Sequence, residues 1–292
     1  MLFLILSILT SSLIQVIFKY FSKHEVDNIQ AIPVNYLTCL LIGLLFNSAP
    51  ITNSELFSFQ NAWFIHSFSL GLMFIVIFLA MAKCAQEISI SVGAVAAKMG
   101  VLFPVVFGWF FLKEEITPIL FTGISLSLVS ILLVGRLHPD HPLKGTRLAL
   151  LPVVIFLGSG FIDTNLKILE NNYFEQVDAH HIVSAIFLGA FISGMVLVAY
   201  NYIRKRHRIK KKNLIAGVLL GIPNYFSIYF LMRALHHKGA LTVYVMPFNN
   251  VGIVLLSVVL SVIIFREQLN NKTKWGIFVA MLSIVLIGLS DI

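Results

Sequence analysis

Two stretches of the sequence, 153 residues apart, share a pattern that divides the whole chain. Leu112 to Gly135 read LKEEITPILFTGISLSLVSILLVG, and Phe265 to Gly288 read FREQLNNKTKWGIFVAMLSIVLIG. Apolar residues match cheaply between any two hydrophobic helices, whereas matched glutamates and glycines are rarer coincidences. The polar and small residues that coincide are Glu114 with Glu267, Gly123 with Gly276, Ser130 with Ser283 and Gly135 with Gly288. The pattern predicts an internal repeat.

A second match lies at the front of each half, at an offset of 148 residues. Ser12-x-x-Gln15-x-x-x-Lys19 aligns with Gly160-x-x-Asp163-x-x-x-Lys167. Together the two matches predict one repeat over residues 1–136, a connecting loop over 137–147 and a second repeat over 148–292.

The composition places both repeats in a membrane. Of the 292 residues, 58% are hydrophobic and only 12% are charged, where a soluble domain carries about 25% charged residues. The mean hydropathy is +0.92. A single soluble core could not bury this much apolar surface. The composition therefore excludes a soluble enzyme, a nucleic-acid-binding domain and a disordered chain, and it indicates an integral membrane protein.

The apolar segments predict an all-α fold with ten transmembrane helices. A bilayer core about 30 Å thick needs about 20 apolar residues per helix, and the alternating pattern of a membrane β-strand is absent. Five helices per half would insert the two repeats in opposite orientations, which is typical of transporters with a site at the repeat interface. The predicted spans are 1–21, 31–47, 62–83, 88–111, 117–135, 149–168, 180–203, 213–236, 240–265 and 273–290.

The formal charge of +8 indicates membrane orientation rather than a nucleic-acid partner. Much of the excess lies in the run from Arg204 to Lys212, between two apolar segments. Basic residues gather in cytoplasmic loops, and here they favour the loops between spans 1–2, 5–6, 7–8 and 9–10. We therefore expect both termini on the non-cytoplasmic side of the cell membrane.

The motif after the fourth span of each half resembles that of a known family. An acidic residue is followed by a glycine-led helix, in Phe111-Leu112-Lys113-Glu114-Glu115 with Gly123 and in Phe265-Arg266-Glu267 with Gly276. Prolines also occur in the preceding spans, at Pro104 and Pro247. The chain resembles the EamA type of the drug/metabolite transporter superfamily. This resemblance implies transport of small metabolites, commonly export of amino acids or related solutes, rather than enzymatic activity.

Lys98 is the first candidate site residue, because it lies in the middle of the span GAVAAKMGVLFPV. An ionisable residue at the centre of a membrane costs about 2.5–3.5 kcal/mol on insertion scales and is a functional candidate by default. It could contact a solute carboxylate or phosphate, or titrate during transport. It could equally bond to carbonyl groups freed near Pro104.

Asp163 is the only carboxylate well inside a predicted span, and Lys167 follows it at the i, i+4 spacing that brings side chains together. The pair could couple transport to protons, or it could be a static pair that carries two charges into the membrane. Gln15 and Lys19 are the repeat counterparts of these residues, and Lys19 is close enough to a helix end to reach the membrane surface.

Polar and aromatic residues in spans eight and nine complete the predicted substrate-binding site. Pro223 and Pro247 each remove a backbone hydrogen bond in their span. Asn249 lies near the repeat counterpart of Lys98, and a cavity lined by such groups would suit a zwitterion or polar organic solute. For each aromatic residue, packing is the alternative role. The predicted contacts besides Lys98 are Asn224, Tyr225, Tyr244, Asn249 and Asn250.

The sequence therefore predicts a secondary transporter in which the two halves move about a midplane site. Its partners would be a small solute, the bilayer and a coupling proton, in a monomer or homodimer. A lipid-linked sugar or headgroup flippase is the nearest alternative, and a membrane-embedded lipid-modifying enzyme a more distant one. Neither the two cysteines nor the pairs at 180–181 and 236–237 form a metal-binding pattern, so no metal or cofactor is expected.

Overall fold

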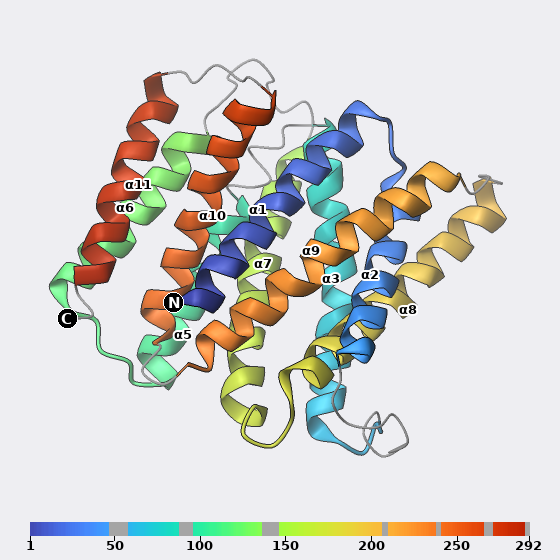
Figure 1. Cartoon of the computed structure of the whole chain (residues 1–292), viewed down its shortest axis with the longest axis horizontal. Coiled ribbons are helices and arrows are strands. Elements are labelled where there is room, and N and C mark those ends of the chain that lie inside the picture. Colours follow the sequence, from blue (N-terminus) through green and yellow to red (C-terminus); the bar gives the residue numbers. More distant parts are fainter. Residues whose placement is uncertain are drawn as a thin grey trace.

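The computed structural model describes residues 1–46, 58–87, 96–135, 146–205, 210–237, 241–265 and 271–289, and these residues form helices without a strand. Figure 1 shows the helices and their labels. Their bounds are α1 Leu2–Lys23, α2 Asn28–Leu45, α3 Ala62–Glu87, α5 Leu102–Phe111, α6 Pro118–Gly135, α7 Thr146–Tyr173, α8 Ala179–Lys205, α9 Lys211–Leu235, α10 Thr242–Phe265 and α11 Asn271–Leu289.

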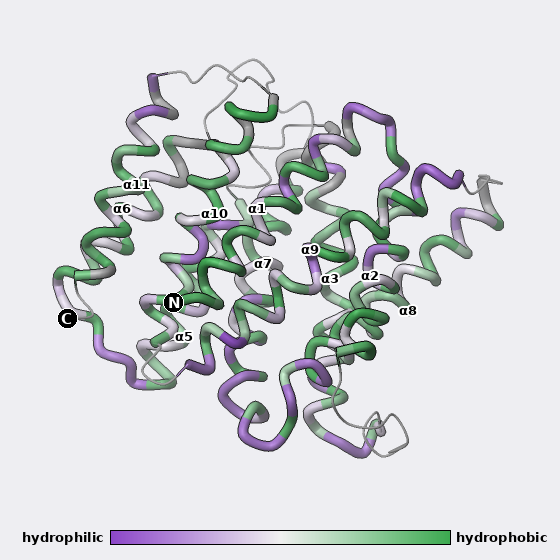
Figure 2. Tube along the Cα trace, viewed as in Figure 1, coloured by the Kyte–Doolittle hydropathy of each residue, from purple (hydrophilic) through white to green (hydrophobic). Residues whose placement is uncertain are grey.

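The expected all-helical membrane protein is confirmed at the level of its helices. Among the described residues, seven helices are long and apolar enough to cross a membrane, namely α1, α2, α3, α7, α8, α9 and α10. Three shorter apolar helices cover Ala96–Phe111, Pro118–Ser130 and Lys274–Ile287. Figure 2 shows hydrophobic residues along the helices and hydrophilic residues gathered at turns such as the one between α7 and α8. The start of the predicted span 88–111 and most of the predicted loop 137–147 lie outside the described residues.

Eight of the helices form two groups (Figure 1). The first group contains α5, α6, α10 and α11, in which α6 packs along α11 and α5 against α10. The second group contains α2, α3, α8 and α9, in which α2 packs against both α8 and α9 and α3 packs against α8. The remaining helices bridge the two groups, because α1 contacts α9 and α10 while α7 contacts α3 and α5.

Each group contains helices from both predicted repeats, and glycines hold the second group together. A Cβ atom at Gly71 of α3 would overlap the backbone of Ile186 in α8. A Cβ atom at Gly217 of α9 would lie 2.5 Å from the carbonyl oxygen of Ala31 in α2. Backbone cannot move aside as a flexible side chain can, so these small residues set the close packing of α3 on α8 and of α2 on α9.

The helix that carries Lys98 tightens directly after this residue. Residues 96–99 are helical, and α5 begins at Leu102 after a turn. Pro104 has no backbone N–H group with which to reach Gly100. The Gly100 carbonyl instead accepts from the Phe103 N–H at 3.0 Å, and the Lys98 carbonyl accepts from the Val101 N–H at 3.3 Å. The carbonyl groups near Lys98 therefore bond to backbone amides.

Candidate functional site

Lys98 meets a polar side chain from the opposite predicted repeat. Its Nζ donates to Oδ1 of Asn250 in α10 at 3.2 Å, across 152 residues of sequence. The Lys98 side chain is half-buried and Asn250 is buried. The contact joins two of the predicted substrate-binding residues in the interior of the helix bundle.

The contact between the backbones of α5 and α7 brings Asp163 to the same place. A Cβ atom at Gly100 would lie 2.7 Å from the backbone nitrogen of Gly160, so the two chains touch through glycines. Asp163 follows Gly160 by three residues, which places it on the same face of α7. Its carboxylate and the Lys98 ammonium interact electrostatically.

Two amide atoms of the adjacent α10 residues Asn249 and Asn250 are buried without a hydrogen-bond partner among the described residues. They are Oδ1 of Asn249 and Nδ2 of Asn250, and the two side chains are only 4% and 3% exposed. A buried polar atom without a partner costs about 1–3 kcal/mol, and such atoms call for an explanation such as a ligand or water. Tyr244, one and a half turns earlier in α10, packs at the edge of the main hydrophobic core.

Gln15, the predicted repeat counterpart of Asp163, lies on α1. Three residues before it, the Ser12 hydroxyl donates to the Ile253 carbonyl of α10 at 3.3 Å. Ser12, which contacts α10, lies three residues before Gln15, and Gly160, which contacts Gly100, lies three residues before Asp163. Gln15 and Lys19 are both half-buried.

The structure separates Lys167 from Asp163 and gives it another carboxylate. Lys167 Nζ pairs with Oε2 of Glu170 at 2.6 Å, and both side chains are buried. Oε1 of Glu170 lies 3.1 Å from Nδ1 of His236, at the end of α9. The i, i+3 spacing on α7 allows this pairing as readily as the i, i+4 spacing would allow one with Asp163, and His236 adds a second partner for Glu170. The expected Asp163–Lys167 pair is therefore replaced by two separate clusters.

Asn224 and Tyr225 also lie apart from Lys98, in the contact of α9 with α2 and α8. Asn224 Nδ2 donates to Oδ1 of Asn35 at 3.1 Å, and the Tyr225 hydroxyl bonds to Nδ1 of His180 at 2.5 Å. The Cys39 thiol donates to the Gly221 carbonyl in the same contact. The residues predicted for one cavity thus fall in separate places, with Lys98, Asp163 and Asn250 in one cluster and Asn224 and Tyr225 in another.

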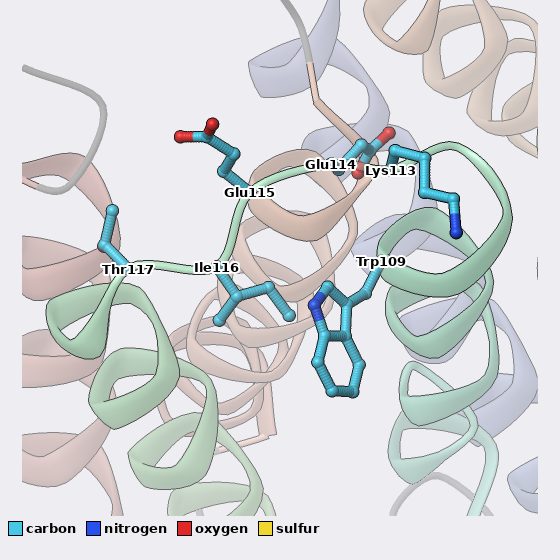
Figure 3. Close-up of a pocket in the computed structure, with 6 residues that line it drawn as sticks. All are labelled: Trp109, Lys113, Glu114, Glu115, Ile116 and Thr117. Atoms are coloured by element: carbon cyan, nitrogen blue, oxygen red, sulfur yellow. The ribbon is translucent and has the colours of Figure 1, made fainter.

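The acidic motif after α5 forms part of an open hollow of about 420 Å³ at the surface. Figure 3 shows its lining, in which Glu114 and Glu115 point in opposite directions. Glu115 is exposed, whereas Glu114 is buried. Both Glu114 oxygens accept from backbone amides at the start of α10, from Thr242 N–H at 3.1 Å and from Val243 N–H at 3.0 Å. The lining residues are Trp109, Lys113, Glu114, Glu115, Ile116 and Thr117.

Sequence reasoning missed the roles of Glu170, His180 and Glu114. Glu170 follows Lys167 by three residues, and this spacing on a helix was a visible signal for a pair. The contact of His180 with Tyr225 and that of Glu114 with α10 have no such local signal, because each joins residues distant in sequence.

The Lys98 cluster offers a cation, a carboxylate, an amide donor and an amide acceptor within one polar region of an apolar bundle. These groups could bind a small solute that carries both charges, or exchange a proton with it. Among the described residues, no group of three or more His, Cys, Asp and Glu side chains could hold a metal ion.

Comparison with known proteins identifies the family. The sequence matches the EamA-like transporter family over residues 1–136 and 172–289. It is 21% identical over 287 residues to an uncharacterized protein of Haemophilus influenzae, covering 96% of this chain and 95% of that one. A protein of known crystal structure has the same fold, with a TM-score of 0.77 at 13% identity over 99% of this chain and 96% of that chain. The chain belongs to the EamA-like transporter family, and it is a multi-pass membrane transporter of the drug/metabolite type rather than an enzyme.

Proposed function

We propose that this protein is a secondary transporter that exports small organic solutes, amino acids or related metabolites, across the cell membrane by alternating access. The observation that carries the proposal is the contact between Lys98 and Asn250, with Asp163 beside it, in the interior of the bundle. Charged groups at such a depth are costly and usually serve a transported solute or ion.

The proposed architecture is ten spans in two inverted five-helix repeats, over residues 1–136 and 148–292. The helix contacts support it, because they occur in exchanged pairs. The α1–α9 contact corresponds to that of α7 with α3, and the α1–α10 contact to that of α7 with α5. The α2–α9 contact corresponds in the same way to that of α8 with α3. In this arrangement Asn249 lies near the repeat counterpart of Lys98, and the contact of Lys98 with the next residue, Asn250, would lie near the pseudo-two-fold axis.

The chemistry of the cluster favours a zwitterionic solute. A solute carboxylate would be received by the Lys98 ammonium and by Nδ2 of Asn250, and a solute ammonium by Asp163 and by Oδ1 of Asn249. Each of these amide atoms is buried and lacks a partner among the described residues. Charge-assisted hydrogen bonds are about twice as strong as neutral ones, so a solute of this kind would compensate much of the cost of the site.

Asp163 is the group that we propose for proton coupling. Its repeat counterpart is Gln15, which cannot titrate, so the two symmetric positions differ in charge. Solute and proton would compete at Asp163, because a carboxylate that has taken up a proton can no longer form a charge pair with the ammonium group of a solute.

The packing favours movement of helix groups over movement of the two sequence halves. Separating residues 1–136 from 148–292 would pull α3 from α8, α2 from α9 and α6 from α11, which are among the closest packings in the protein. The group of α5, α6, α10 and α11 can instead shift relative to the group of α2, α3, α8 and α9. The bridging helices α1 and α7 would then control access to the site.

The orientation and assembly are also part of the proposal. The distribution of Lys and Arg favours non-cytoplasmic termini. The sites and both groups of helices are contained in one chain, so a monomer would form a complete pathway and a homodimer would not be required for transport.

The test is solute uptake into proteoliposomes that contain the purified protein, a pool of amino acids and small metabolites, and an imposed pH gradient. Accumulation that disappears when the gradient is removed supports a proton-coupled carrier. Equilibration without accumulation would contradict the role of Asp163 in coupling. If no soluble solute moves but a fluorescent lipid crosses the bilayer, the flippase alternative replaces the proposal.

A further inference from the structure

We propose that Glu114 is a positioning residue for the interior site, which holds α10 in the rotation that brings Asn250 to Lys98. This inference rests on the proposed function for its effect on transport, but not for its effect on α10. The residues that support it lie in the turn after α5, where the first predicted repeat contacts α10 of the second.

Glu114 binds the end of a helix that is distant in the sequence. Its two carboxylate oxygens accept from the first two backbone amides of α10, at Thr242 and Val243, across 128 and 129 residues. The first amides of a helix have no partner within it, and a negative charge there interacts favourably with the helix dipole. The side chain is 8% exposed, so water screens this interaction only weakly.

The turn is built to deliver the carboxylate to that place. Lys113 takes a positive φ of 57°, a conformation that is uncommon for a residue with a side chain. The Glu114 N–H then donates back to the Gly108 carbonyl at 3.1 Å. A Cβ atom at Gly108 would lie 2.6 Å from Oε2 of Glu114 and 3.3 Å from the Thr242 side chain. Because Gly108 has no side chain, the Glu114 carboxylate has space between α5 and the start of α10 (Figure 3 shows the turn).

The bound amides are in register with the interior site. Asn249 and Asn250 follow Thr242 and Val243 by seven residues each, which is two helical turns and about 10 Å. Seven residues return a helix to nearly the same face. A rotation of the start of α10 would therefore turn Asn250 away from Lys98, whose own helix leads into α5. Glu114 thus acts on the two helices that form the Lys98–Asn250 contact.

The first measurement is amide hydrogen exchange at the start of α10 in the purified full chain. The variants are Glu114→Gln, which keeps one acceptor oxygen but loses the charge, and Gly108→Ala, which displaces the carboxylate. The exposed neighbour supplies the control Glu115→Gln. Loss of the charge weakens these hydrogen bonds to about half their strength, so we expect exchange at residues 242–246 to quicken about ten-fold in both variants and to stay unchanged in the control. Unchanged exchange in Glu114→Gln would overturn the inference, whether or not the protein transports any tested solute.

The second measurement separates positioning from general stability. Glu114→Gln should raise the KM for the transported solute several-fold, with a smaller effect on the maximal rate. In an Asn250→Ala background the same substitution should leave KM unchanged, because the residue that it positions is already absent. An equal rise in KM in both backgrounds would show that Glu114 acts elsewhere and would overturn the positioning role. If the wild-type protein transports none of the tested solutes although exchange at the start of α10 responds to the variants as expected, the result counts against the proposed function and not against the role of Glu114.

Discussion

Lys98 and Asn250 lie 152 residues apart in the sequence, and the ammonium of one donates to the amide oxygen of the other at 3.2 Å. Asn250 is next to Asn249, the residue near the predicted repeat counterpart of Lys98, so a contact of this kind is what a pseudo-two-fold axis would produce. A strict copy would place two like groups on the axis. Here one position carries a charge and the other a neutral amide, which lets the pair bond rather than repel.

Replacing Lys98 should abolish transport without unfolding the protein. We expect Lys98→Met to reduce solute uptake to background, because the cation that receives the solute is lost, while the helix keeps a side chain of similar length. The melting temperature in detergent should fall only moderately, because the cost of placing the lysine charge in the membrane disappears while the Asp163 carboxylate and Oδ1 of Asn250 lose their partner. The matched control is Lys211→Met, which changes an exposed lysine at the start of α9. Uptake at the wild-type rate in Lys98→Met would remove Lys98 from the mechanism.

Replacing Asp163 should separate transport from the proton gradient. Asp163→Asn keeps the size of the side chain but cannot titrate, and it gives α7 the same kind of group that Gln15 gives α1. We expect proteoliposomes with this variant to equilibrate solute down its own gradient, with no accumulation under an imposed pH gradient. Glu115→Gln serves as the control. Persisting gradient-driven accumulation in Asp163→Asn would show that another group carries the proton.

The sequence predicted helices far better than it predicted the contacts between them. Spans such as 180–203 and 240–265 match α8 and α10 closely, because apolar length and flanking charges are local properties. The α7 helix is longer than its predicted span of 149–168, since the Lys167–Glu170 pair lets charged residues remain within it.

The sequence could not predict that Asn224 and Tyr225 would lie apart from Lys98. Tyr225 faces His180 rather than Lys98 because the rotation of α9 is set by its glycine contacts with α2, at Gly217 and Gly221. Helix periodicity gives the faces of a helix, but it does not say which neighbour each face will meet. The Lys98–Asn250 contact was closer to expectation, because the repeat itself carries long-range information.

The close approach of Gly100 and Gly160 should tolerate no side chain. Gly100→Ala would place a Cβ atom 2.7 Å from the backbone of α7, and relieving such overpacking costs about 1–3 kcal/mol. We expect a lower melting temperature, together with reduced transport, because separating the helices also moves Asp163 from Lys98. The control is Thr122→Ala, whose exposed hydroxyl bonds only to its own helix. An unchanged melting temperature in Gly100→Ala would contradict the close contact of the two backbones.

Removing Glu170 alone should destabilise the protein more than replacing both members of the Lys167–Glu170 pair. Glu170→Ala leaves the Lys167 ammonium buried at 6% exposure without its carboxylate, and breaking a buried pair in this way costs about 3–5 kcal/mol. The double variant Lys167→Met/Glu170→Leu removes both charges and should recover most of that loss, because well-packed apolar residues often replace a buried pair at no net cost. Unfolding by denaturant in mixed micelles measures the differences, with the exposed Glu175→Gln as the control. If the double variant is no more stable than Glu170→Ala, the pair is not the source of the effect, and the bond from Glu170 to His236 at 3.1 Å becomes the interaction that holds α7 to α9.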